Sequence, residues 1–375
     1  MLLYVHVPFC RQKCNYCAFH SFAPEPGGIE RYAGLVEKEI SFWCKHLGRR
    51  KVDTVYFGGG TPSLLPIETV TRITETIDKA FRLKEGFEFT FEANPESAVD
   101  WGYLPELFRL GVNRLSLGVQ SFNDHDLLLL GRRHSARQAE GAYNLARGVG
   151  FENIGLDLIW GLPGQNLKAW MAQLAHAVKL APQHLSCYGL TLEPDTPLPE
   201  MLKSRGLIFE PESELSKMFI HGAEYLEEAG YLQYEISNFA RMGYASLHNS
   251  GYWEGEDYLG LGPSAVSTLQ GARFEAPRGL DAYAEAVEGG ELLKSIETLD
   301  DETRRREMVM LGLRTSKGLD LKAYRQLAGR SFLKEYEAIV TALRQHELIR
   351  ISAGRLRLTK FGMLVSDTII GKFFE

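Results

Sequence analysis

The first half of the chain alternates between short apolar runs and segments with helical spacing. Six of the runs are typical of buried strands and predict strands at Leu2–Val7, Val52–Phe57, Phe87–Glu92, Val112–Val119, Asn153–Trp160 and His184–Leu190. The segments between them have apolar residues at helical spacing, as at Ile67, Val70, Ile73 and Ile77. This alternation predicts a parallel sheet with right-handed crossovers. Six units are too few for a closed eight-stranded barrel, so we expect an α/β fold with a partial (β/α)6 barrel.

The pattern changes after the sixth predicted strand. Four prolines between Glu193 and Pro211 predict a loop, and a helix is expected at about Glu214–Ala229, followed by an extended stretch at Gln233–Phe239. Residues 244–270 are rich in glycine and aromatic residues without a clear period. We expect this segment to fold back over the open end of the barrel.

The last part of the chain predicts a small separate domain. From about residue 297 the pattern is charged and helical, and Ile349–Thr359 holds two alternating runs around a turn, which is typical of a hairpin. Helices followed by a hairpin indicate a C-terminal α+β domain of winged-helix type. We therefore divide the chain into a barrel at 1–240, a closing segment at 241–296 and a C-terminal domain at 297–375.

Composition restricts the class of protein. The 375 residues are 45% hydrophobic and 24% charged, as in ordinary soluble globular proteins. The net charge of −6 argues against broad binding of nucleic acid. No apolar run is long enough to span a membrane, and no signal peptide is expected ahead of the first cysteine. Cys44 and Cys187 stand alone in apolar segments and are predicted core residues, so we expect a reducing, cytoplasmic location.

The other three cysteines crowd directly after the first predicted strand. Cys10, Cys14 and Cys17 form a C-x3-C-x2-C array. Three thiolates are one short of the four that usually close a structural zinc or iron–sulfur site. On a four-iron cluster, one iron would stay open to a small molecule. The alternatives are a zinc site completed by His6 or His20, or a loop of reduced thiols.

Polar residues fall at or near the ends of later strands, where parallel sheets carry their chemistry. The turn Gly58–Pro62 is rich in glycine, so backbone N–H groups there can approach a ligand, although a plain tight turn is an alternative. Asp157 stands inside an apolar strand, which is costly without a partner. It either recognises a ligand or forms an internal ion pair with Arg132. Glu92 and Gln120 are placed similarly.

The cysteine motif resembles that of the radical S-adenosylmethionine (SAM) superfamily. There the open iron of a [4Fe–4S] cluster is chelated by SAM, which an electron from the cluster cleaves to methionine and a 5′-deoxyadenosyl radical. The longer string Tyr4–Cys10 is similar to the group that contains oxygen-independent coproporphyrinogen III dehydrogenase and related haem chaperones. The resemblance extends to about residue 270. It implies the radical SAM barrel, with the cluster on Cys10, Cys14 and Cys17.

The same resemblance implies a set of SAM contacts. They are Tyr4, Tyr16, Gly59, Gly60, Thr61, Glu92, Gln120, Arg132, Asp157 and Val266. The glycine turn matches a motif that contacts the amino group of SAM, and Val266 matches a position whose backbone touches the adenine. Tyr16 matches an aromatic residue near the adenine, with simple loop packing as the alternative. Carboxylates and amides suit ribose hydroxyls, and a guanidinium suits the methionine carboxylate.

Two departures distinguish the branches of the group. The dehydrogenase has a fourth cysteine two residues after the third, where this sequence has Phe19. It also has a long N-terminal segment, whereas only three residues precede Tyr4 here. Both differences favour the chaperone branch.

A third feature favours that branch as well. His248, Asn249, Tyr252 and Trp253 fit the pattern H-N-x-x-Y-W, with which the chaperones of the group bind haem. A neutral imidazole is a standard axial ligand of haem iron, and the two aromatic rings offer flat faces to a porphyrin. Asn249 would orient the imidazole ring. A histidine that is merely packed among aromatic residues is the alternative.

The resemblance therefore implies a haem chaperone that binds a [4Fe–4S] cluster, SAM and haem. We expect it to deliver haem to recipient haem proteins, namely respiratory enzymes at the inner face of the membrane, without being an integral membrane protein. No catalytic residue is assigned. The alternatives are coproporphyrinogen III dehydrogenase activity, or another radical SAM reaction with haem as substrate. Whether the chain forms a homodimer, and whether SAM is consumed, stay open.

Overall fold

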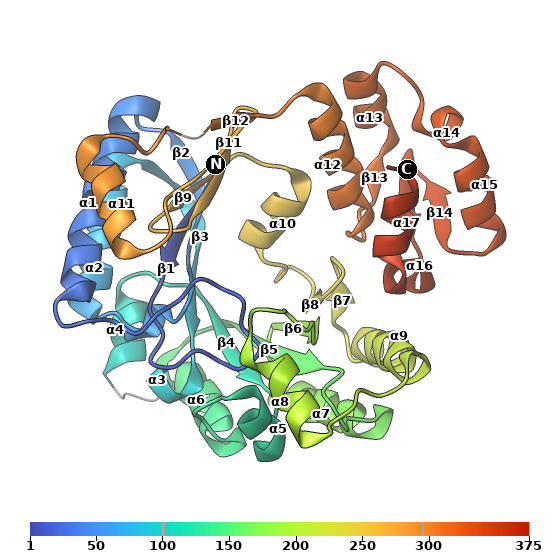
Figure 1. The fold of residues 1–375 in the computed structure, drawn as a ribbon, viewed down its shortest axis with the longest axis horizontal. Coiled ribbons are helices and arrows are strands. Elements are labelled where there is room, and N and C mark those ends of the chain that lie inside the picture. The colour runs from blue at the N-terminus through green and yellow to red at the C-terminus, as the bar shows by residue number, and fades with distance from the viewer. Residues whose placement is uncertain (99–101, 295, 375) are drawn as a thin grey trace. The chain divides into compact units, whose positions relative to one another are not determined.

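The computed structural model describes residues 1–98, 102–294 and 296–374. The chain divides into two compact units, and most elements of both are labelled in Figure 1. Unit 1 comprises Met1–Ile159, Leu190–Ile208 and Asp257–Glu297. Unit 2 comprises Trp160–Gly189, Phe209–Glu256 and Thr298–Glu375.

Unit 1 is organised around parallel strands. Five of them pair side by side in chain order: β1 (Leu2–Val7), β2 (Lys51–Gly59), β3 (Arg82–Ala93), β4 (Arg114–Gln120) and β5 (Asn153–Trp160). Four further strands extend the sheet beyond β1, in the order β9 (Tyr258–Leu261), β10 (Val266–Leu269), β11 (Ala272–Glu275) and β12 (Ile296–Thr298). β9 is parallel to β1, and β10 is antiparallel to both β9 and β11.

Helices connect and cover these strands. They are α1 (Gly28–Leu47), the 3₁₀ turn η1 (Pro62–Leu64), α2 (Ile67–Ala80), α3 (Pro95–Ala98), α4 (Tyr103–Arg109), α5 (Asp124–Leu130), α6 (Ala136–Val149), α8 (Pro197–Arg205) and α11 (Leu280–Gly289). In Figure 1, α1, α2 and α11 lie together beside β1–β3. α1 buries the apolar stripe that includes Val36, Ile40 and Trp43, as its helical spacing requires.

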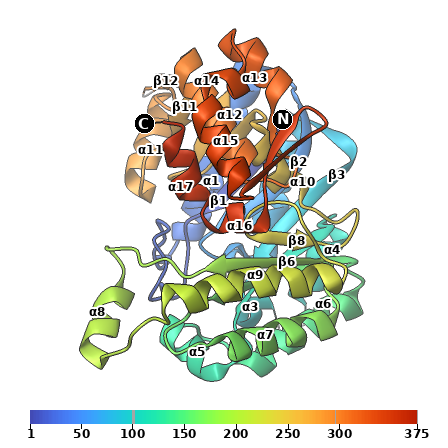
Figure 2. The same cartoon turned by 90° about the vertical axis from the view of Figure 1, so that its right-hand side faces the viewer.

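Unit 2 contains a short antiparallel sheet with helices, and the C-terminal domain. Its first elements are α7 (Leu167–Leu180), β6 (His184–Gly189), α9 (Glu212–Glu228), β7 (Leu232–Gln233), β8 (Asn238–Ala240) and α10 (Leu247–Glu254). β8 pairs in antiparallel fashion with both β6 and β7. Figure 2 shows α7 and α9 side by side.

The C-terminal domain is a set of short helices packed on a three-stranded antiparallel sheet. The strands are β13 (Leu319–Asp320), β15 (Arg355–Leu358) and β14 (Ile349–Ser352), in that order. The helices are α12 (Asp301–Leu313), α13 (Leu321–Ala328), α14 (Phe332–Glu335), α15 (Glu337–Gln345), α16 (Lys360–Leu364) and α17 (Ser366–Lys372). Leu313, Tyr324, Phe332 and Leu356 are at the centre of its core.

The predicted fold class is confirmed. All six predicted strands are present, and β1 and β5 agree with the prediction at both ends. The hairpin predicted within Ile349–Thr359 is β14–β15, in a small α+β domain. The boundaries proposed at residues 240 and 296 stay predictions. Among the described residues, no helix is long and apolar enough to cross a membrane.

Two segments that were predicted to lack regular structure, Glu193–Pro211 and 244–270, contain helices. These helices are short, so their apolar residues show no clear helical period in the sequence. The proline-rich stretch contains α8, which begins at Pro197; the first turn of a helix tolerates proline because its N–H groups have no intrahelical partner. The glycine-rich segment at 244–270 contains α10, β9 and β10. The side chain of Ser246 caps α10, and Gly255 ends it in the left-handed region at φ 70°.

A buried carboxylate joins three parts of unit 1. Glu39, on α1, is 1% exposed. Its Oε2 accepts hydrogen bonds from the Tyr283 hydroxyl on α11 (2.5 Å) and from the N–H of Gly262 (2.7 Å), in the turn after β9. Trp43 Nε1 donates to its Oε1 at 3.4 Å. Burial raises the pKa of Glu39 to about 7, against the effect of these three donors.

This carboxylate predicts how the stability of unit 1 depends on pH. Because the pKa is higher in the folded chain than in the unfolded one, the folded state binds the extra proton between about pH 4.5 and 7. Stability therefore falls as pH rises through this window, by roughly 3 kcal/mol in total. In urea unfolding of the cofactor-free chain at several pH values, Glu39→Gln should remove that part of the slope.

The matched control is Glu288→Gln. Glu288 forms an exposed ion pair with Lys38, which lowers its pKa, so it contributes no fall of stability with rising pH. This variant should keep the wild-type slope. The same pH slope in Glu39→Gln and wild type would show that the carboxylate does not titrate there.

Candidate functional site

The cysteine loop leaves the C-terminal end of β1 and is held in place by backbone contacts. The N–H of Cys10 donates to the carbonyl of Phe22 at 3.0 Å, which closes the loop at its base. In its middle, Asn15 donates from its backbone N–H to Leu130 O (3.0 Å) and from Nδ2 to Leu129 O (2.9 Å), at the end of α5. The loop is therefore fixed at its base and at its centre by contacts within the chain.

The three thiols of the loop are all partly buried. Burial raises the pKa of the Cys17 thiol, against a hydrogen bond from the Phe19 backbone. No group of three or more His, Cys, Asp or Glu side chains within the described residues is arranged to hold a single metal ion. The three thiols of an iron–sulfur cluster each bind a different iron, so they need not converge on the position of a single metal ion. Phe19, at the position of the dehydrogenase's fourth cysteine, is 65% exposed.

The glycine turn after β2 lies against the start of the cysteine loop. Gly60 N–H donates to Val7 O and Thr61 N–H to Phe9 O, each at 2.7 Å. A Cβ on Gly60 would lie 2.6 Å from Phe9 O, which no side chain tolerates. In this structure the N–H groups of Gly60 and Thr61 therefore donate to the backbone that leads into the cysteine loop, and Gly60 is needed for this close approach. That Gly59, Gly60 and Thr61 contact SAM stays a prediction.

A row of polar side chains crosses the sheet from β1 to β5. Tyr4 is in register with Tyr56, with ring centroids 6.0 Å apart, and the Tyr56 hydroxyl donates to Glu92 at 2.6 Å. Glu92 is in register with Ser116, whose hydroxyl donates to Asp157 at 3.1 Å. The structure thus brings Tyr4, Glu92 and Asp157 into one row. Sequence reasoning missed Tyr56 and Ser116, although their alternation within the strands was a usable signal.

Glu92 is a carboxyl group that changes charge near neutral pH. Burial raises its pKa to about 7; the hydrogen bond from Tyr56 opposes this shift, and the negative charge of Asp157 adds to it. The N–H of Gly59 and the buried cation Arg114 on β4 act in the opposite direction. Arg114 was not predicted as part of the site. The row therefore combines acceptors for hydroxyl groups with one buried cation.

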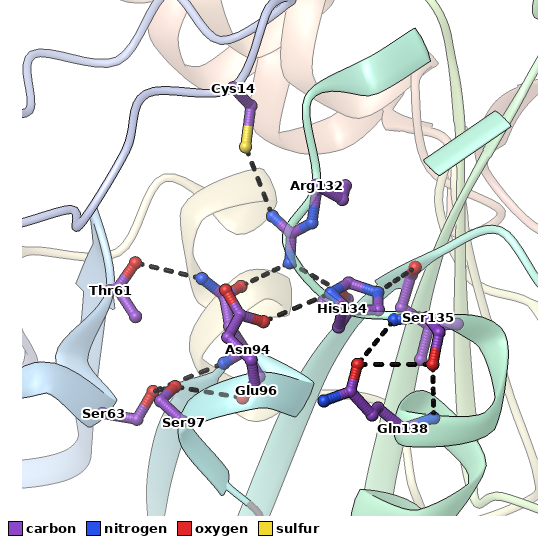
Figure 3. A network of polar contacts seen from close by, with 12 residues as sticks. Cys14, Thr61, Ser63, Asn94, Glu96, Ser97, Arg132, His134, Ser135 and Gln138 are labelled. Carbon is purple, nitrogen blue, oxygen red and sulfur yellow. Dashed lines mark hydrogen bonds and ion pairs between the residues drawn. The ribbon is translucent and has the colours of Figure 1, made fainter. Parts of the chain in front are cut away.

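Arg132 connects the polar residues with the cysteine loop. Its Nη2 donates to Asn94 Oδ1 at 2.6 Å and to Gly118 O at 2.8 Å, and its Nη1 lies 3.5 Å from Cys14 Sγ (Figure 3). These hydrogen bonds do not involve Asp157, the ion-pair partner that the sequence suggested. The hydroxyl of Tyr16 also lies beside this guanidinium, and burial raises the pKa of Tyr16.

A second layer of polar residues, which the sequence did not single out, supports Arg132. Asn94 donates from Nδ2 to Thr61 Oγ1 at 3.1 Å. His134 is 3% exposed; its Nδ1 lies 3.2 Å from Glu96 Oε2 and its Nε2 3.0 Å from Val119 O (Figure 3). Burial alone would raise the pKa of Glu96, but the hydrogen bond from His134 and the charge of Arg132 hold it below its usual value.

A pocket opens beside Cys14 at this point. Its walls include Arg11, Thr61, Asn94, Glu96 and Arg132. Arg132 Nε is buried and has no hydrogen-bond partner. A buried cationic donor beside the Cys14 thiol suits an anionic cluster and a ligand that carries a carboxylate. The residues present thus fit the two cofactors implied by the sequence.

The last two predicted SAM residues lie at strand ends. Gln120 ends β4 with φ 65°, a strained conformation for a residue other than glycine. Val266 begins β10, and a Cβ on Gly260 would lie 2.4 Å from its carbonyl oxygen. β10 pairs with β9, and β9 pairs with β1 in a register that sets Gly260 opposite Tyr4. The strand of Val266 is therefore two strands from that of Tyr4.

The predicted haem residues lie in unit 2, on α10. His248 is 1% exposed, and its Nε2 lies 3.0 Å from the Tyr252 hydroxyl, with the rings edge to face. Asn249 Nδ2 donates to the Tyr234 hydroxyl at 3.2 Å. Trp253 Nε1 is buried without a hydrogen-bond partner. In this conformation the imidazole is packed, so iron ligation through Nε2 requires its contact with Tyr252 to open.

Comparison with known proteins identifies the family. The model of the radical SAM superfamily matches residues 4–175, and that of the HemN C-terminal domain matches residues 299–365. A protein of Bacillus subtilis named heme chaperone HemW is 32% identical, over 99% of this chain and 98% of its own length. A protein of Bos taurus named radical S-adenosyl methionine domain-containing protein 1, mitochondrial, is 35% identical over 98% of this chain and 86% of its own.

The fold also matches a solved structure over nearly its whole length. Coproporphyrinogen III oxidase (HemN) from Escherichia coli, described as a radical SAM enzyme, aligns with a TM-score of 0.86 and 25% identity. The alignment covers 99% of this chain and 89% of that one. Together with the curated relatives, this match leads to one conclusion: the chain belongs to the radical SAM superfamily and, within it, to the coproporphyrinogen III dehydrogenase-like group that includes the heme chaperones HemW.

Proposed function

We propose that this protein is a haem chaperone that binds a [4Fe–4S] cluster, SAM and haem, and that delivers haem to recipient haem proteins. The observation that carries this proposal is the nearly full-length similarity to proteins named heme chaperone HemW. Phe19 supports it, because an exposed phenylalanine stands where the dehydrogenase has a fourth cysteine.

In this proposal the cofactors of unit 1 occupy neighbouring places. Cys10, Cys14 and Cys17 hold the cluster and leave one iron open. The polar row from Tyr4 to Asp157, together with Gln120, accepts hydrogen bonds from the ribose of SAM. The turn Gly59–Thr61 contacts the amino group of SAM, and Arg132 pairs with the methionine carboxylate. When bound, the reduced cluster supplies an electron to SAM. The chain's own residues orient SAM and exclude other ligands from the open iron.

The haem site of the proposal is α10 in unit 2. His248 ligates the iron, Tyr252 and Trp253 pack on the macrocycle, and Asn249 orients the imidazole. The buried Trp253 Nε1 without a partner supports this, since a bound ligand with an acceptor group would satisfy it. We further propose a cytoplasmic location and recipients among respiratory enzymes at the membrane.

The second candidate is oxygen-independent coproporphyrinogen III dehydrogenase. The structural similarity to the E. coli coproporphyrinogen III oxidase favours it. The two candidates differ in one assay: the dehydrogenase forms protoporphyrinogen from coproporphyrinogen under anaerobic, reducing conditions with SAM, and the chaperone does not.

The cluster ligands are tested by single substitutions. Replacing Cys10, Cys14 or Cys17 by alanine should abolish the visible absorbance of the reconstituted cluster, because each removes an iron ligand. Cys44→Ala and Cys187→Ala are the controls. Cys44 Sγ donates to Ala80 O, and Cys187 is 7% exposed in the core. Loss of cluster loading in Cys44→Ala would refute this set of ligands.

The SAM site is tested at Asp157. Asp157→Ala should weaken SAM binding by roughly 1–3 kcal/mol, the effect of losing hydrogen bonds in a buried polar site, and should leave the cluster intact. Ser116→Ala, which removes only the hydroxyl that donates to Asp157, should have a smaller effect. Calorimetric titration measures both. Unchanged SAM affinity with a lowered melting temperature would instead support a purely structural role for Asp157.

The haem site is tested at His248 and Tyr252. His248→Ala should weaken haem binding or change the Soret band, with normal cluster content. Tyr252→Phe removes the hydroxyl that lies 3.0 Å from His248 Nε2 but keeps the ring, so it should retain haem at least as well as wild type. Trp253→Ala should weaken retention without changing the axial-ligand spectrum. Haem binding unaffected by His248→Ala would place the haem elsewhere.

A further inference from the structure

A continuous chain of polar contacts connects two of the cluster cysteines. Cys10 Sγ lies 3.5 Å from Thr61 Oγ1, and Asn94 Nδ2 donates to the same oxygen at 3.1 Å. Asn94 Oδ1 accepts from Arg132 Nη2 at 2.6 Å, and Arg132 Nη1 lies 3.5 Å from Cys14 Sγ. We call Thr61, Asn94 and Arg132 the cluster belt; Figure 3 shows it from Thr61 to Cys14.

The direction of each hydrogen bond in the cluster belt follows from the chemistry of its members. A guanidinium only donates, so the atom of Asn94 that faces Arg132 must be its carbonyl oxygen. Its amide nitrogen then faces Thr61 and donates to the hydroxyl oxygen. The single proton of that hydroxyl is left for Cys10, whose thiolate only accepts. Both ends of the cluster belt therefore present donors to thiolates.

Within the cluster belt, the side chain of Asn94 contacts neither cysteine. It contacts Thr61, which lies beside Cys10, and Arg132, which lies beside Cys14. Its backbone is fixed separately: its N–H donates to Ser63 Oγ at 3.3 Å, and its carbonyl accepts from Ser97 N–H at 3.0 Å. A substitution of the side chain thus leaves the backbone contacts of the turn between β3 and α3 in place. This makes the function of the amide separable from the folding of the turn.

Donors to cluster thiolates affect the reduction of the cluster. Reduction adds a negative charge, and hydrogen bonds to the sulfur ligands and a nearby cation stabilise the reduced state. Thr61 is 5% exposed, so its hydroxyl is shielded from competing water. Without the amide of Asn94, nothing in the belt would hold this hydroxyl toward Cys10, and Arg132 would keep only Gly118 O as a neutral acceptor at Nη2.

We propose that Asn94 is a positioning residue for the cluster: it holds Thr61 and Arg132 as donors to the thiolates of Cys10 and Cys14, and thereby raises the reduction potential of the cluster. The inference rests on the proposed function, because it presupposes a [4Fe–4S] cluster on these cysteines. It goes beyond that function by assigning a role to a residue that does not touch the cluster.

The test is a redox titration of the reconstituted full-length chain without SAM, followed by EPR. Asn94→Ala should shift the midpoint potential to a more negative value with unchanged iron and sulfide content. Thr61→Val should shift it in the same direction. The shift in the double variant should be smaller than the sum of the two, because both act through the same donor to Cys10.

The matched control is Gln138→Ala. Gln138 closes the capping box of α6 with Ser135, and both residues lie in the same region in Figure 3. Losing the Gln138 side chain destabilises the start of α6 but leaves the cluster belt intact. The midpoint potential of the cluster in Gln138→Ala should therefore equal that of the wild type.

Two outcomes would overturn the proposal: a wild-type midpoint in Asn94→Ala with full cluster content, or additive shifts in the double variant. If Asn94→Ala does not retain iron, Thr61→Val decides alone, since valine keeps the shape of threonine and removes one donor. An unchanged midpoint there also overturns the proposal. By contrast, a wild-type chain without the EPR signal of a reduced [4Fe–4S] cluster would refute the proposed function itself.

Discussion

The arrangement of the candidate site depends on the close approach of two backbones at the ends of β1 and β2. The parallel register sets Val7 opposite Gly59, and the next residues continue the contact, with Gly60 N–H and Thr61 N–H donating to the chain that leads into Cys10. Only glycine fits at residue 60, because a Cβ there would meet Phe9 O at 2.6 Å. This contact brings the cysteine loop and Thr61 together.

The same sheet determines the electrostatics of the site. Parallel pairing in chain order aligns one polar side chain per strand, and burial in this row raises the pKa of Glu92 to about 7. Arg114 and Arg132 supply the positive charges, one beside the row and one beside the cysteine loop. The site is therefore suited to a zwitterionic ligand with hydroxyl groups. That chemistry agrees with SAM, the ligand that membership of the radical SAM superfamily implies.

Much of this arrangement could be predicted from the sequence, and the exceptions have physical reasons. Apolar periodicity located all six strands, and cysteine spacing located the loop. Tyr56, Ser116 and Asn94 were missed because their partners are distant in sequence: those of Tyr56 and Ser116 lie on neighbouring strands, and those of Asn94 lie in the loops at Thr61 and Arg132. The sequence pattern does not reveal the register and loop positions that bring them together. The contact of the glycine turn with the cysteine loop was missed for the same reason: the N–H groups of Gly60 and Thr61 donate to a backbone far away in sequence.

On α10, the sequence predicts which residues form the motif but not how their side chains pack. The sequence motif names His248 but not its environment, and in the structure the imidazole is buried against Tyr252 on its own helix. A buried histidine is compatible with a packed residue and with a ligand that is exposed only when haem arrives. A measurement of haem binding separates these two roles.

The most direct test of the account is anaerobic reconstitution of the wild-type chain with iron and sulfide, followed by haem titration read by absorbance with and without SAM. The account predicts a chain that carries a cluster, binds haem saturably with a Soret band, and passes that haem to a haem-free acceptor protein. It would be contradicted by a cluster-bearing chain that binds no haem, or by one that converts coproporphyrinogen to protoporphyrinogen.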